Sequence, residues 1–177
     1  MERAKKNCYL MLRERGYNVF IQSDGGVFDP AMIAKRGVSQ LVVYAFPDGK
    51  VGVRDTRRIV ADTEAREISH AVVLYPQGIT PFAKTDLLKN TTTRFEIFHT
   101  DFFLFHLTRH VLVPEHVVLS ASEKRKVADR YGIDKLPRIS VNDPVARWLD
   151  LGRGTIVKIE EASPEGHLVT EYRVVTG

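Results

Sequence analysis

Three histidines, His106, His110 and His116, come nearest in this sequence to a catalytic or metal-binding pattern. His106 and His110 have the i, i+4 spacing that places two imidazoles on one face of a helix, where they could bind zinc. The sequence has no His-Glu-x-x-His motif, and its single cysteine, Cys8, is remote from these histidines. We therefore expect the histidines to form hydrogen bonds within a domain junction rather than a metal site.

Motifs for other common chemistries are missing from the sequence as well. It contains no Gly-x-Gly-x-x-Gly loop, no Walker-type lysine loop and no Gly-x-Ser-x-Gly turn. A basic cluster is expected to be a solvated helix face or, as the alternative, a contact to phosphate; its members are Lys124, Arg125, Lys126 and Arg130. We predict a non-catalytic protein with no metal ion and no cofactor.

Three peptides between Leu112 and Arg147 each place a proline beside a charged residue and an apolar one. They are Leu112-Val113-Pro114-Glu115-His116, Leu136-Pro137-Arg138-Ile139 and Asp143-Pro144-Val145-Ala146-Arg147. Because proline restricts the backbone, such peptides build rigid, shaped surfaces. They favour a docking module over an enzyme.

The elements that position these peptides follow from apolar spacing and turn chemistry. In the first hundred residues we expect strands at residues 17–21, 38–46, 51–54, 70–75 and 94–98. Helices are expected at residues 4–15, 55–68 and 80–90, with Asp55 capping the second and Thr80-Pro81 opening the third. Pro47-Asp48-Gly49 should fold the strand at 51–54 back as a hairpin, and Ser23–Gly26 should be a loop. This order predicts a mixed α/β unit with one βαβ crossover.

The C-terminal part is predicted to be a small sheet with two short helices. Strands are expected at residues 111–119, 155–161 and 168–175, with a type I turn at 163–166. Ser120 and Glu123 form the capping box of one helix, which Gly132 ends. Asp143, followed by Pro144, caps the second helix.

The phenylalanine-rich peptide at residues 101–107 should be a buried connector between two domains. A platform on which bases stack is the alternative. We therefore expect an α/β (α+β) protein with domains at residues 1–108 and 109–177.

The order of elements in the first domain matches the core of restriction-endonuclease-like nucleases. Those enzymes hold a divalent metal with an acidic residue near the second strand and an acidic-x-Lys triplet on the third. The predicted third strand, Val51-Gly52-Val53-Arg54, has neither the carboxylate nor the lysine. We expect an endonuclease-like scaffold without nuclease activity, and a relict endonuclease remains an alternative.

Composition is that of an ordinary globular protein, with 177 residues of which 44% are hydrophobic and 27% charged. The net charge of +4 points mildly toward polyanions such as DNA. The sequence lacks both an apolar run of roughly 20 residues and the apolar core of a signal peptide, so no membrane partner is expected. A single cysteine excludes an internal disulfide and favours a reducing, intracellular compartment.

The three proline-containing peptides, with the Gly152-Arg153-Gly154 turn and the Val157-Lys158-Ile159 strand, resemble the fifth subunit of eukaryotic DNA-directed RNA polymerases. The resemblance is dense from about His110 to Val175 and continues more thinly through residues 13–17 and 77–81. In that family the subunit is shared by polymerases I, II and III, and its C-terminal part is similar to a small archaeal polymerase subunit. Its N-terminal part is a jaw with an endonuclease-like α/β fold and no working catalytic centre.

The resemblance implies a non-catalytic subunit of a multisubunit RNA polymerase in the nucleus. A C-terminal assembly domain would anchor on the largest subunit, among other polymerase subunits, through Pro114, Glu115, His116, Arg138, Asp143, Pro144 and Arg147. The jaw would contact downstream duplex DNA weakly and without sequence preference through Gly78, Thr80, Pro81 and Lys84. The helix that begins there offers amides and a dipole that favour a phosphate. A stand-alone basic DNA-binding protein is the remaining alternative.

Two features depart from the family pattern. The sequence is shorter than we expect for the eukaryotic subunit, with the shortfall between Ile21 and Val38. The peptide Phe102–Phe105 is also more aromatic than in the family. Both features suit a divergent copy from a reduced eukaryote or a large DNA virus, and a viral copy would be found in the virion or host cell.

Overall fold

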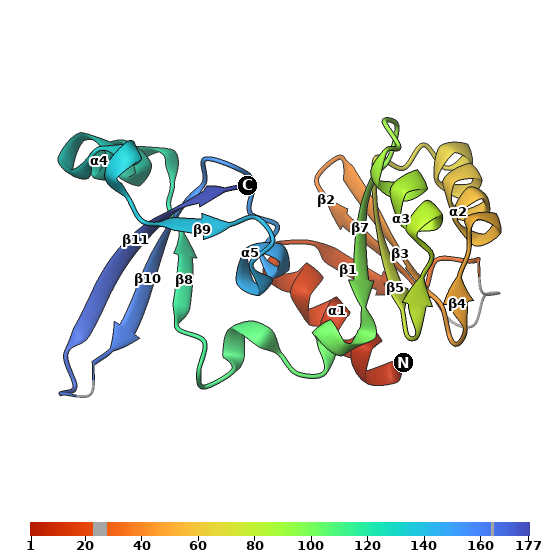
Figure 1. The fold of residues 1–177 in the computed structure, drawn as a ribbon, viewed down its shortest axis with the longest axis horizontal. Helices are drawn as coiled ribbons and strands as arrows, with labels where there is room; N and C mark the ends of the chain where they lie inside the picture. The colour runs from red at the N-terminus through yellow and green to blue at the C-terminus, as the bar shows by residue number, and fades with distance from the viewer. Residues whose placement is uncertain (23–27, 164) are drawn as a thin grey trace. The chain divides into compact units, whose positions relative to one another are not determined.

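The computed structural model describes residues 1–22, 28–163 and 165–177 and has two compact units, Met1–Phe105 and His106–Gly177 (Figure 1). Each unit contains its own sheet and its own buried apolar side chains. The loop predicted at Ser23–Gly26 lies outside the described residues, as does Pro164 of the predicted turn. Helices and sheets occur together in both units, which confirms the predicted α/β (α+β) class.

The N-terminal unit is a five-stranded mixed sheet with helices on both faces. Its strands, in spatial order, are β1 (Asn18–Ile21), β2 (Met32–Arg36), β3 (Ser39–Ala45), β5 (His70–Tyr75) and β7 (Arg94–His99). The first three strands pair antiparallel, whereas β3, β5 and β7 run parallel. The helices are α1 (Glu2–Glu14), α2 (Val53–Ala65) and α3 (Pro81–Leu88). Because α2 and α3 each connect two parallel strands, the unit has two βαβ crossovers where the sequence predicted one.

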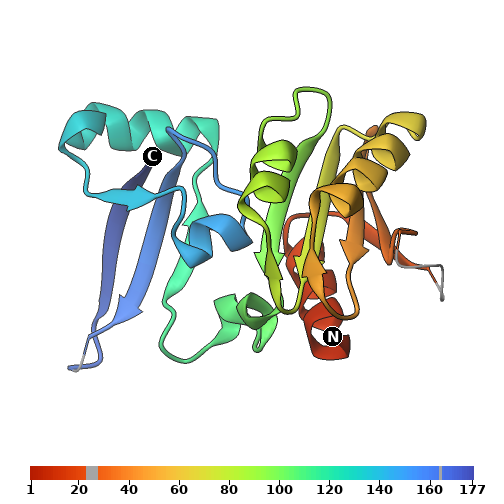
Figure 2. The ribbon, with the colours of Figure 1, turned by 45° about the vertical axis from the view of Figure 1, so that its right-hand side comes forward.

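Alternation along the strands produces one apolar layer on each face of this sheet. The layer on the side of α2 and α3 is a buried cluster that includes Val42, Tyr44, Ile59, Ala71, Val73 and Leu87. The alternate positions of β3 and β5, on the side of α1, are also fully buried; they are Leu41, Val43, Val72 and Leu74. Figures 1 and 2 show α2 and α3 together on one face and α1 on the other. Burial on both faces explains why β3 and β5 appear in the sequence as continuous apolar runs.

The hairpin predicted at residues 38–54 is wrong. The two-residue strand β4 (Lys50–Val51) pairs parallel with β6 (Gly78–Ile79) instead of returning along β3, and α2 already begins at Val53. The predicted cap is wrong as well, because Gly52 is the N-cap and Asp55 accepts a hydrogen bond from the Gly52 backbone N at 2.8 Å. Valines at alternate positions imitate a strand here, but the pairing partner of β4 comes from a distant segment.

Strand β2 was not predicted from the sequence. Its residues, Met-Ile-Ala-Lys-Arg, include alanine and lysine, which are depleted in strands. Antiparallel pairing with β1 on one side and β3 on the other stabilises it nevertheless. Tertiary pairing therefore overrides a weak local preference.

The C-terminal unit is a small sheet with two short helices, as predicted, but it has a fourth strand, β9 (Arg138–Ser140), that was not predicted from the sequence. The strands, in spatial order, are β8 (Glu115–Val118), β10 (Ile156–Ala162), β11 (Leu168–Thr176) and β9. Strand β9 is parallel to β11, and the other pairs are antiparallel. The helices are α4 (Ala121–Tyr131) and α5 (Pro144–Trp148), with 3-10 turns η2 (Leu107–Arg109) and η3 (Ile133–Lys135).

Two small apolar clusters hold the C-terminal sheet. On the face of α4, Val127 packs with Leu136, Ile156 and Val174. The other cluster contains Ile139, Val157, Ile159 and Val175, with Val141 and Leu151 from the segment around α5 packed against it. Each face of this sheet thus has an apolar cluster, while the first residues of β11 stay exposed.

The predicted helix caps of the C-terminal unit are confirmed. Ser120 and Glu123 exchange both hydrogen bonds of a capping box, and Gly132 ends α4 with a φ of +75°. The Asp143 carboxylate accepts hydrogen bonds from the backbone N of Val145 and Ala146, at 2.8 and 3.3 Å. The strand predicted at 111–119 is shorter than expected, because pairing with β10 begins only at Glu115, after Pro114.

The phenylalanine-rich peptide is only partly buried. It begins with the 3-10 turn η1 (Thr100–Phe103), in which Phe103 is fully buried and packs against Phe98 with ring centroids 5.3 Å apart. Leu104 and Phe105 are about half exposed. Asn7 of α1 donates a hydrogen bond to the Phe103 carbonyl at 2.8 Å, which fastens the end of the N-terminal unit to its first helix.

Across the described residues, none of the helices combines the length and apolar character needed to cross a bilayer.

Candidate functional site

We call the three proline-containing peptides the docking peptides. The first of them, Leu112–His116, lies at one edge of the C-terminal sheet. Strand β8 pairs with β10 on one side, and no other described strand pairs with it. Glu115 is exposed, and the Nδ1 atom of half-buried His116 forms a 2.8 Å hydrogen bond with the Pro114 carbonyl oxygen. Val111 and Leu112, just before the strand, are 92% and 82% exposed. An open strand edge beside exposed apolar side chains is suited to docking.

Arg138 lies at the opposite edge of the same sheet. Its strand, β9, pairs with β11, so β10 and β11 separate Arg138 from the first docking peptide. Ile139 is buried, while Arg138 is exposed, and among the described residues no acidic side chain forms an ion pair with it. The predicted partner-binding residues therefore form separate surfaces rather than one.

The third docking peptide forms α5. Asp143 caps this helix, because its carboxylate accepts hydrogen bonds from two backbone N–H groups. Capping alone explains why an aspartate stands at this position. Pro144, the first helical residue, is exposed, and Arg147 is half-buried. Pro144 and Arg147 are thus the residues of this peptide whose side chains reach the surface.

The predicted DNA-proximal residues form one continuous segment where β6 leads into α3. Thr80 is the N-cap of α3, and its hydroxyl accepts a hydrogen bond from the Ala83 backbone N at 3.3 Å. Pro81 and Lys84 are exposed, and Phe82 between them is 82% exposed. The free amides and the positive end of the helix dipole favour an anion here, and Lys84 adds a positive charge.

Pairing of β4 with β6 brings a second basic segment to the same place. Lys50 lies opposite Gly78, and the Thr80 backbone N donates to the Val51 carbonyl at 3.0 Å. Helices α2 and α3, which follow these two strands, therefore begin side by side. The sequence analysis missed Lys50 and also Arg54 of α2, which are both exposed. One signal could have indicated this pairing. The same order of elements, a two-residue strand and then a helix, follows both Gly49 and Gln77.

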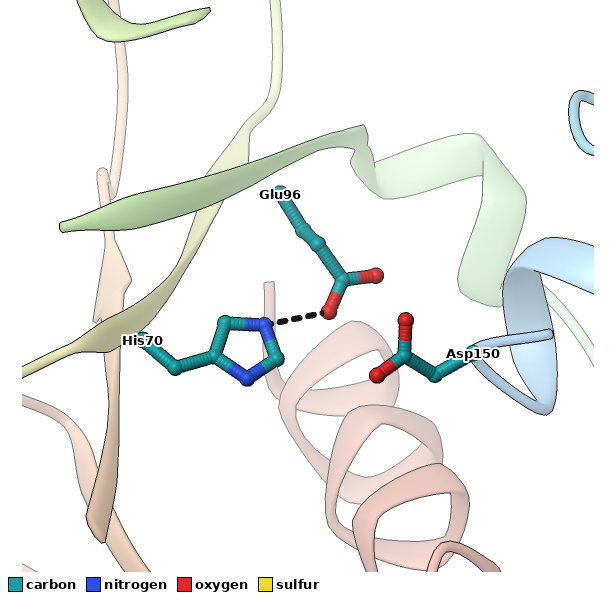
Figure 3. Close-up of side chains that lie close together, drawn as sticks. All are labelled: His70, Glu96 and Asp150. Carbon is teal, nitrogen blue, oxygen red and sulfur yellow. Dashed lines mark hydrogen bonds and ion pairs between the residues drawn. The ribbon is translucent and has the colours of Figure 1, made fainter. Parts of the chain in front are cut away.

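The N-terminal unit also contains a buried charged cluster that the sequence analysis did not predict. Glu96 on β7 accepts two hydrogen bonds from the Arg15 guanidinium, at 2.7 and 2.9 Å, and forms a third with His70 Nε2 on β5 at 2.7 Å. Figure 3 shows the bond between His70 and Glu96; Asp150, also drawn there, belongs to the C-terminal unit. Bidentate pairing of this kind is strong and directional.

The charge state of Glu96 follows from these contacts. Burial by itself would raise the pKa of Glu96, but hydrogen bonds from His70 and Arg15, together with the positive charge of Arg15, lower it to about 2. Glu96 is therefore a carboxylate at neutral pH. It ties the end of α1 to the sheet, which is a structural role.

The three histidines near the boundary between the units form local hydrogen bonds. His106 Nδ1 lies 3.3 Å from Thr108 Oγ1, and His110 Nδ1 accepts a hydrogen bond from the Leu112 backbone N at 3.2 Å. His106 precedes the 3-10 turn η2, so the i, i+4 spacing does not place two imidazoles on one face of an α-helix. The prediction that these histidines act as hydrogen-bonding groups is confirmed.

The comparison with nucleases has to be made on a different strand from the one predicted. Val53 and Arg54 belong to α2, and the third strand of the sheet is β3, with the sequence Ser-Gln-Leu-Val-Val-Tyr-Ala. Strand β3 also lacks both the carboxylate and the lysine that the metal-dependent reaction requires. The argument against a nuclease therefore holds on the strand that the structure identifies.

Known proteins resemble this chain in sequence. Residues 105–175 match the family described as RNA polymerase Rpb5, C-terminal domain. The subunit rpabc1 of DNA-directed RNA polymerases I, II, and III from Dictyostelium discoideum is 38% identical over 148 residues, which cover 80% of this chain and 75% of that protein. The corresponding RPABC1 subunits of Caenorhabditis elegans and Caenorhabditis briggsae are 35% identical over 139 residues, which cover 77% of this chain and 66% of each relative.

These similarities are not confined to the C-terminal unit. An alignment of 148 residues is longer than the unit His106–Gly177, so it includes part of the N-terminal unit as well. The resemblance predicted from the proline-containing peptides is confirmed. The chain belongs to the RPABC1 family of DNA-directed RNA polymerase subunits and is a non-catalytic subunit.

Proposed function

We propose that the C-terminal unit anchors the chain on the largest subunit of a nuclear RNA polymerase, and that the N-terminal unit is a jaw beside downstream duplex DNA. One observation carries the first half of this proposal. The family match at residues 105–175 coincides almost residue for residue with the compact unit His106–Gly177. The part that identifies the family is therefore a self-contained domain, as expected of an assembly module.

Two surfaces of the C-terminal unit support an anchoring role. The free edge of β8 lies next to the exposed side chains of Val111 and Leu112, and burying apolar surface drives association. Helix α5 offers Arg147, and arginine is enriched in protein interfaces. The residues proposed to face the partner are Pro114, Glu115, His116, Arg138, Pro144 and Arg147, whereas Asp143 contributes by capping α5.

Replacing Arg147 by Ala should weaken association with the largest subunit by on the order of tenfold, because a hydrogen bond to a charged group contributes roughly 1.5 to 3 kcal/mol. The melting temperature should fall much less. Co-purification of the tagged chain with the largest subunit measures the first effect, and calorimetry measures the second. Arg153→Ala is the matched control, since Arg153 is an exposed arginine in the neighbouring turn. Unchanged co-purification with a collapsed melting temperature would show that Arg147 is only structural.

The jaw proposal is supported by the charges where α2 and α3 begin. Lys50, Arg54 and Lys84 are all exposed around these helix starts. Binding to DNA scales with the number of phosphates neutralised, so three cations give only weak contact. The free chain should bind duplex DNA with a Kd on the order of 10⁻⁴ to 10⁻⁶ M at physiological salt, without sequence preference.

A photo-crosslinking amino acid at Phe82 should label downstream duplex DNA in the assembled polymerase. Phe82 is better suited than Thr80, because Thr80 caps α3 whereas Phe82 is 82% exposed and is replaced by another aromatic group. The control is the same amino acid at Phe20, which is 57% exposed on the edge strand β1. If position 82 labels only protein, or labels DNA no better than position 20, the jaw is not beside the DNA.

A further inference from the structure

The outer edge of β11 is longer than the strand that covers it. Strand β11 has nine residues, but β9 pairs only with Val174–Thr176. From Leu168 to Arg173, β11 has β10 on one side and no described strand on the other.

The direction of the backbone groups along this edge follows from the bonds at its covered end. The Val174 N donates to the Pro137 carbonyl, away from β10, whereas the Val175 N donates to Thr155 on the side of β10. Because backbone groups alternate along a strand, Thr170 and Tyr172 direct their N–H and C=O groups to the open side, as Val174 does. Within the described chain, these groups of Thr170 and Tyr172 form no hydrogen bond. An extended peptide is the ligand that matches such a row of donors and acceptors.

A groove of about 290 Å³ runs beside this open edge. Its lining combines β11 with the end of α4 and the segment leading into β9: Tyr131, Lys135, Leu136, Pro137, Thr170, Glu171 and Tyr172. The rings of Tyr131 and Tyr172 lie 5.9 Å apart, and Tyr172 shares its face of the sheet with Thr170 and Leu168. A strand added along β11 would therefore direct alternate side chains into the groove, where tyrosine rings and Leu136 favour an apolar residue.

The first three residues of this open edge, Leu168–Thr170, lack the usual protections of an edge strand, whereas Glu171 and Arg173 farther along are charged. Proline, inward-pointing charges and bulges keep edges from pairing. In the described segment Leu168–Thr170 there is none of these, and Leu168 and Val169 are 67% and 53% exposed. An edge that begins with an apolar, unprotected stretch and lies next to a groove is suited to pairing.

The charge of the groove specifies its occupant further. Glu171 is already paired with Arg173 at 2.9 Å. Lys135 is the groove residue whose charge has no ion-pair partner among the described residues. The complementary peptide carries an acidic side chain close to the apolar one.

We propose that an extended segment of another polymerase subunit, with an acidic residue next to an apolar one, pairs with Leu168–Tyr172. It would form an added strand on the same side of β11 as β9. This inference rests on the proposed assembly role of the C-terminal unit. It assigns that role a second surface, distinct from the edge of β8 and from α5.

Amide hydrogen exchange of the unmodified chain, free and within the purified polymerase, tests whether the added strand forms. In the free chain the amides of Thr170 and Tyr172 should exchange fast, because they face solvent. In the polymerase they should slow by at least about a hundredfold, as expected when exposed amides enter a strand ladder. Val169 and Glu171, whose amides face β10, are the internal controls and should be protected in both states.

Thr170→Pro gives an independent test. Proline removes the outward N–H and blocks the edge but leaves the bonds to β10 intact. Retention in the polymerase should fall by about tenfold or more, since at least one main-chain bond and its neighbours are lost. Thr170→Val, which keeps the N–H and the side-chain volume, should be retained normally. Lys135→Glu should weaken retention, whereas Lys126→Glu, on an exposed position of α4, should not.

The outcomes separate this inference from the proposed function. If the chain is retained but Thr170 and Tyr172 exchange as fast as in the free chain, the added strand does not exist and the anchoring proposal stands. If the chain is not retained at all, both are overturned. Protection that appears in the concentrated free chain and disappears on dilution would identify a second copy of the chain as the occupant, which also overturns the proposal.

Discussion

Replacing Glu96 by Ala is expected to lower the free energy of unfolding by about 3 to 5 kcal/mol, the usual cost of removing one partner of a buried ion pair. The Arg15 side chain is 1% exposed, and without Glu96 its guanidinium would lose both of its bonds to that carboxylate. His70 would lose its bond to the same group. Urea denaturation measures the change. Glu64→Ala, at an exposed position of α2, is the control and should change stability by less than about 0.5 kcal/mol.

The same cluster predicts a dependence of stability on acid. The pKa of Glu96 is lowered from 4.5 to about 2 in the folded chain, so the folded state favours the carboxylate. The resulting stabilisation is fully present above the unfolded pKa of 4.5 and is lost as the pH falls toward 2. Glu96→Gln should therefore be less stable than the natural chain at neutral pH and should lose less stability across this window. Parallel curves of stability against pH for the two proteins would rule out the assigned role of Glu96.

When the two units are expressed as separate fragments, only the C-terminal one should be retained in the polymerase. The fragment His106–Gly177 should fold alone and remain with the polymerase, and the fragment Met1–Phe105 should be lost from it completely. The reason is that the C-terminal unit has its own capped helices and its own apolar clusters on both faces of the sheet. A dispersed amide spectrum and a cooperative melting transition establish folding, although a domain of this size has a limited core.

Co-purification with a tag on each fragment then measures retention. A C-terminal fragment without a dispersed spectrum would show that this unit is not autonomous. Retention of a folded N-terminal fragment without the C-terminal fragment would show that the anchor lies in the N-terminal unit, contrary to the proposal.

Local chemistry predicted the starts of three helices well. Ser120 with Glu123, Asp143 with Pro144, and Thr80 with Pro81 each determine a helix start through contacts within four residues. Such contacts can be read from neighbouring letters, because the donor and the acceptor belong to the same turn. The failure at Asp55 has the same origin, since Gly52 is the N-cap and provides no side chain to recognise.

Strand partners were much less predictable. Valines at positions 51 and 53 suggested a hairpin with β3, yet β4 pairs with β6 and the next residues form a helix. Strand β2 went unnoticed because its stability comes from neighbours on both sides. Backbone hydrogen bonds between strands carry no information about residue type, so the sequence pattern could not identify these partners.

The sequence by itself determined three of the helix caps, the two central buried strands and the membership of a polymerase subunit family. Each of these depends on residue types at fixed short spacing. Only the tertiary structure decided which distant residues meet: Arg15 with Glu96, Lys50 with Gly78, and Tyr131 with Tyr172. It also placed the first two docking peptides on opposite edges of one sheet and the third on α5, and it left six of the nine residues of β11 uncovered on one side. These arrangements depend on strand order and register, which are set by packing over the whole unit and not by any local run of residues.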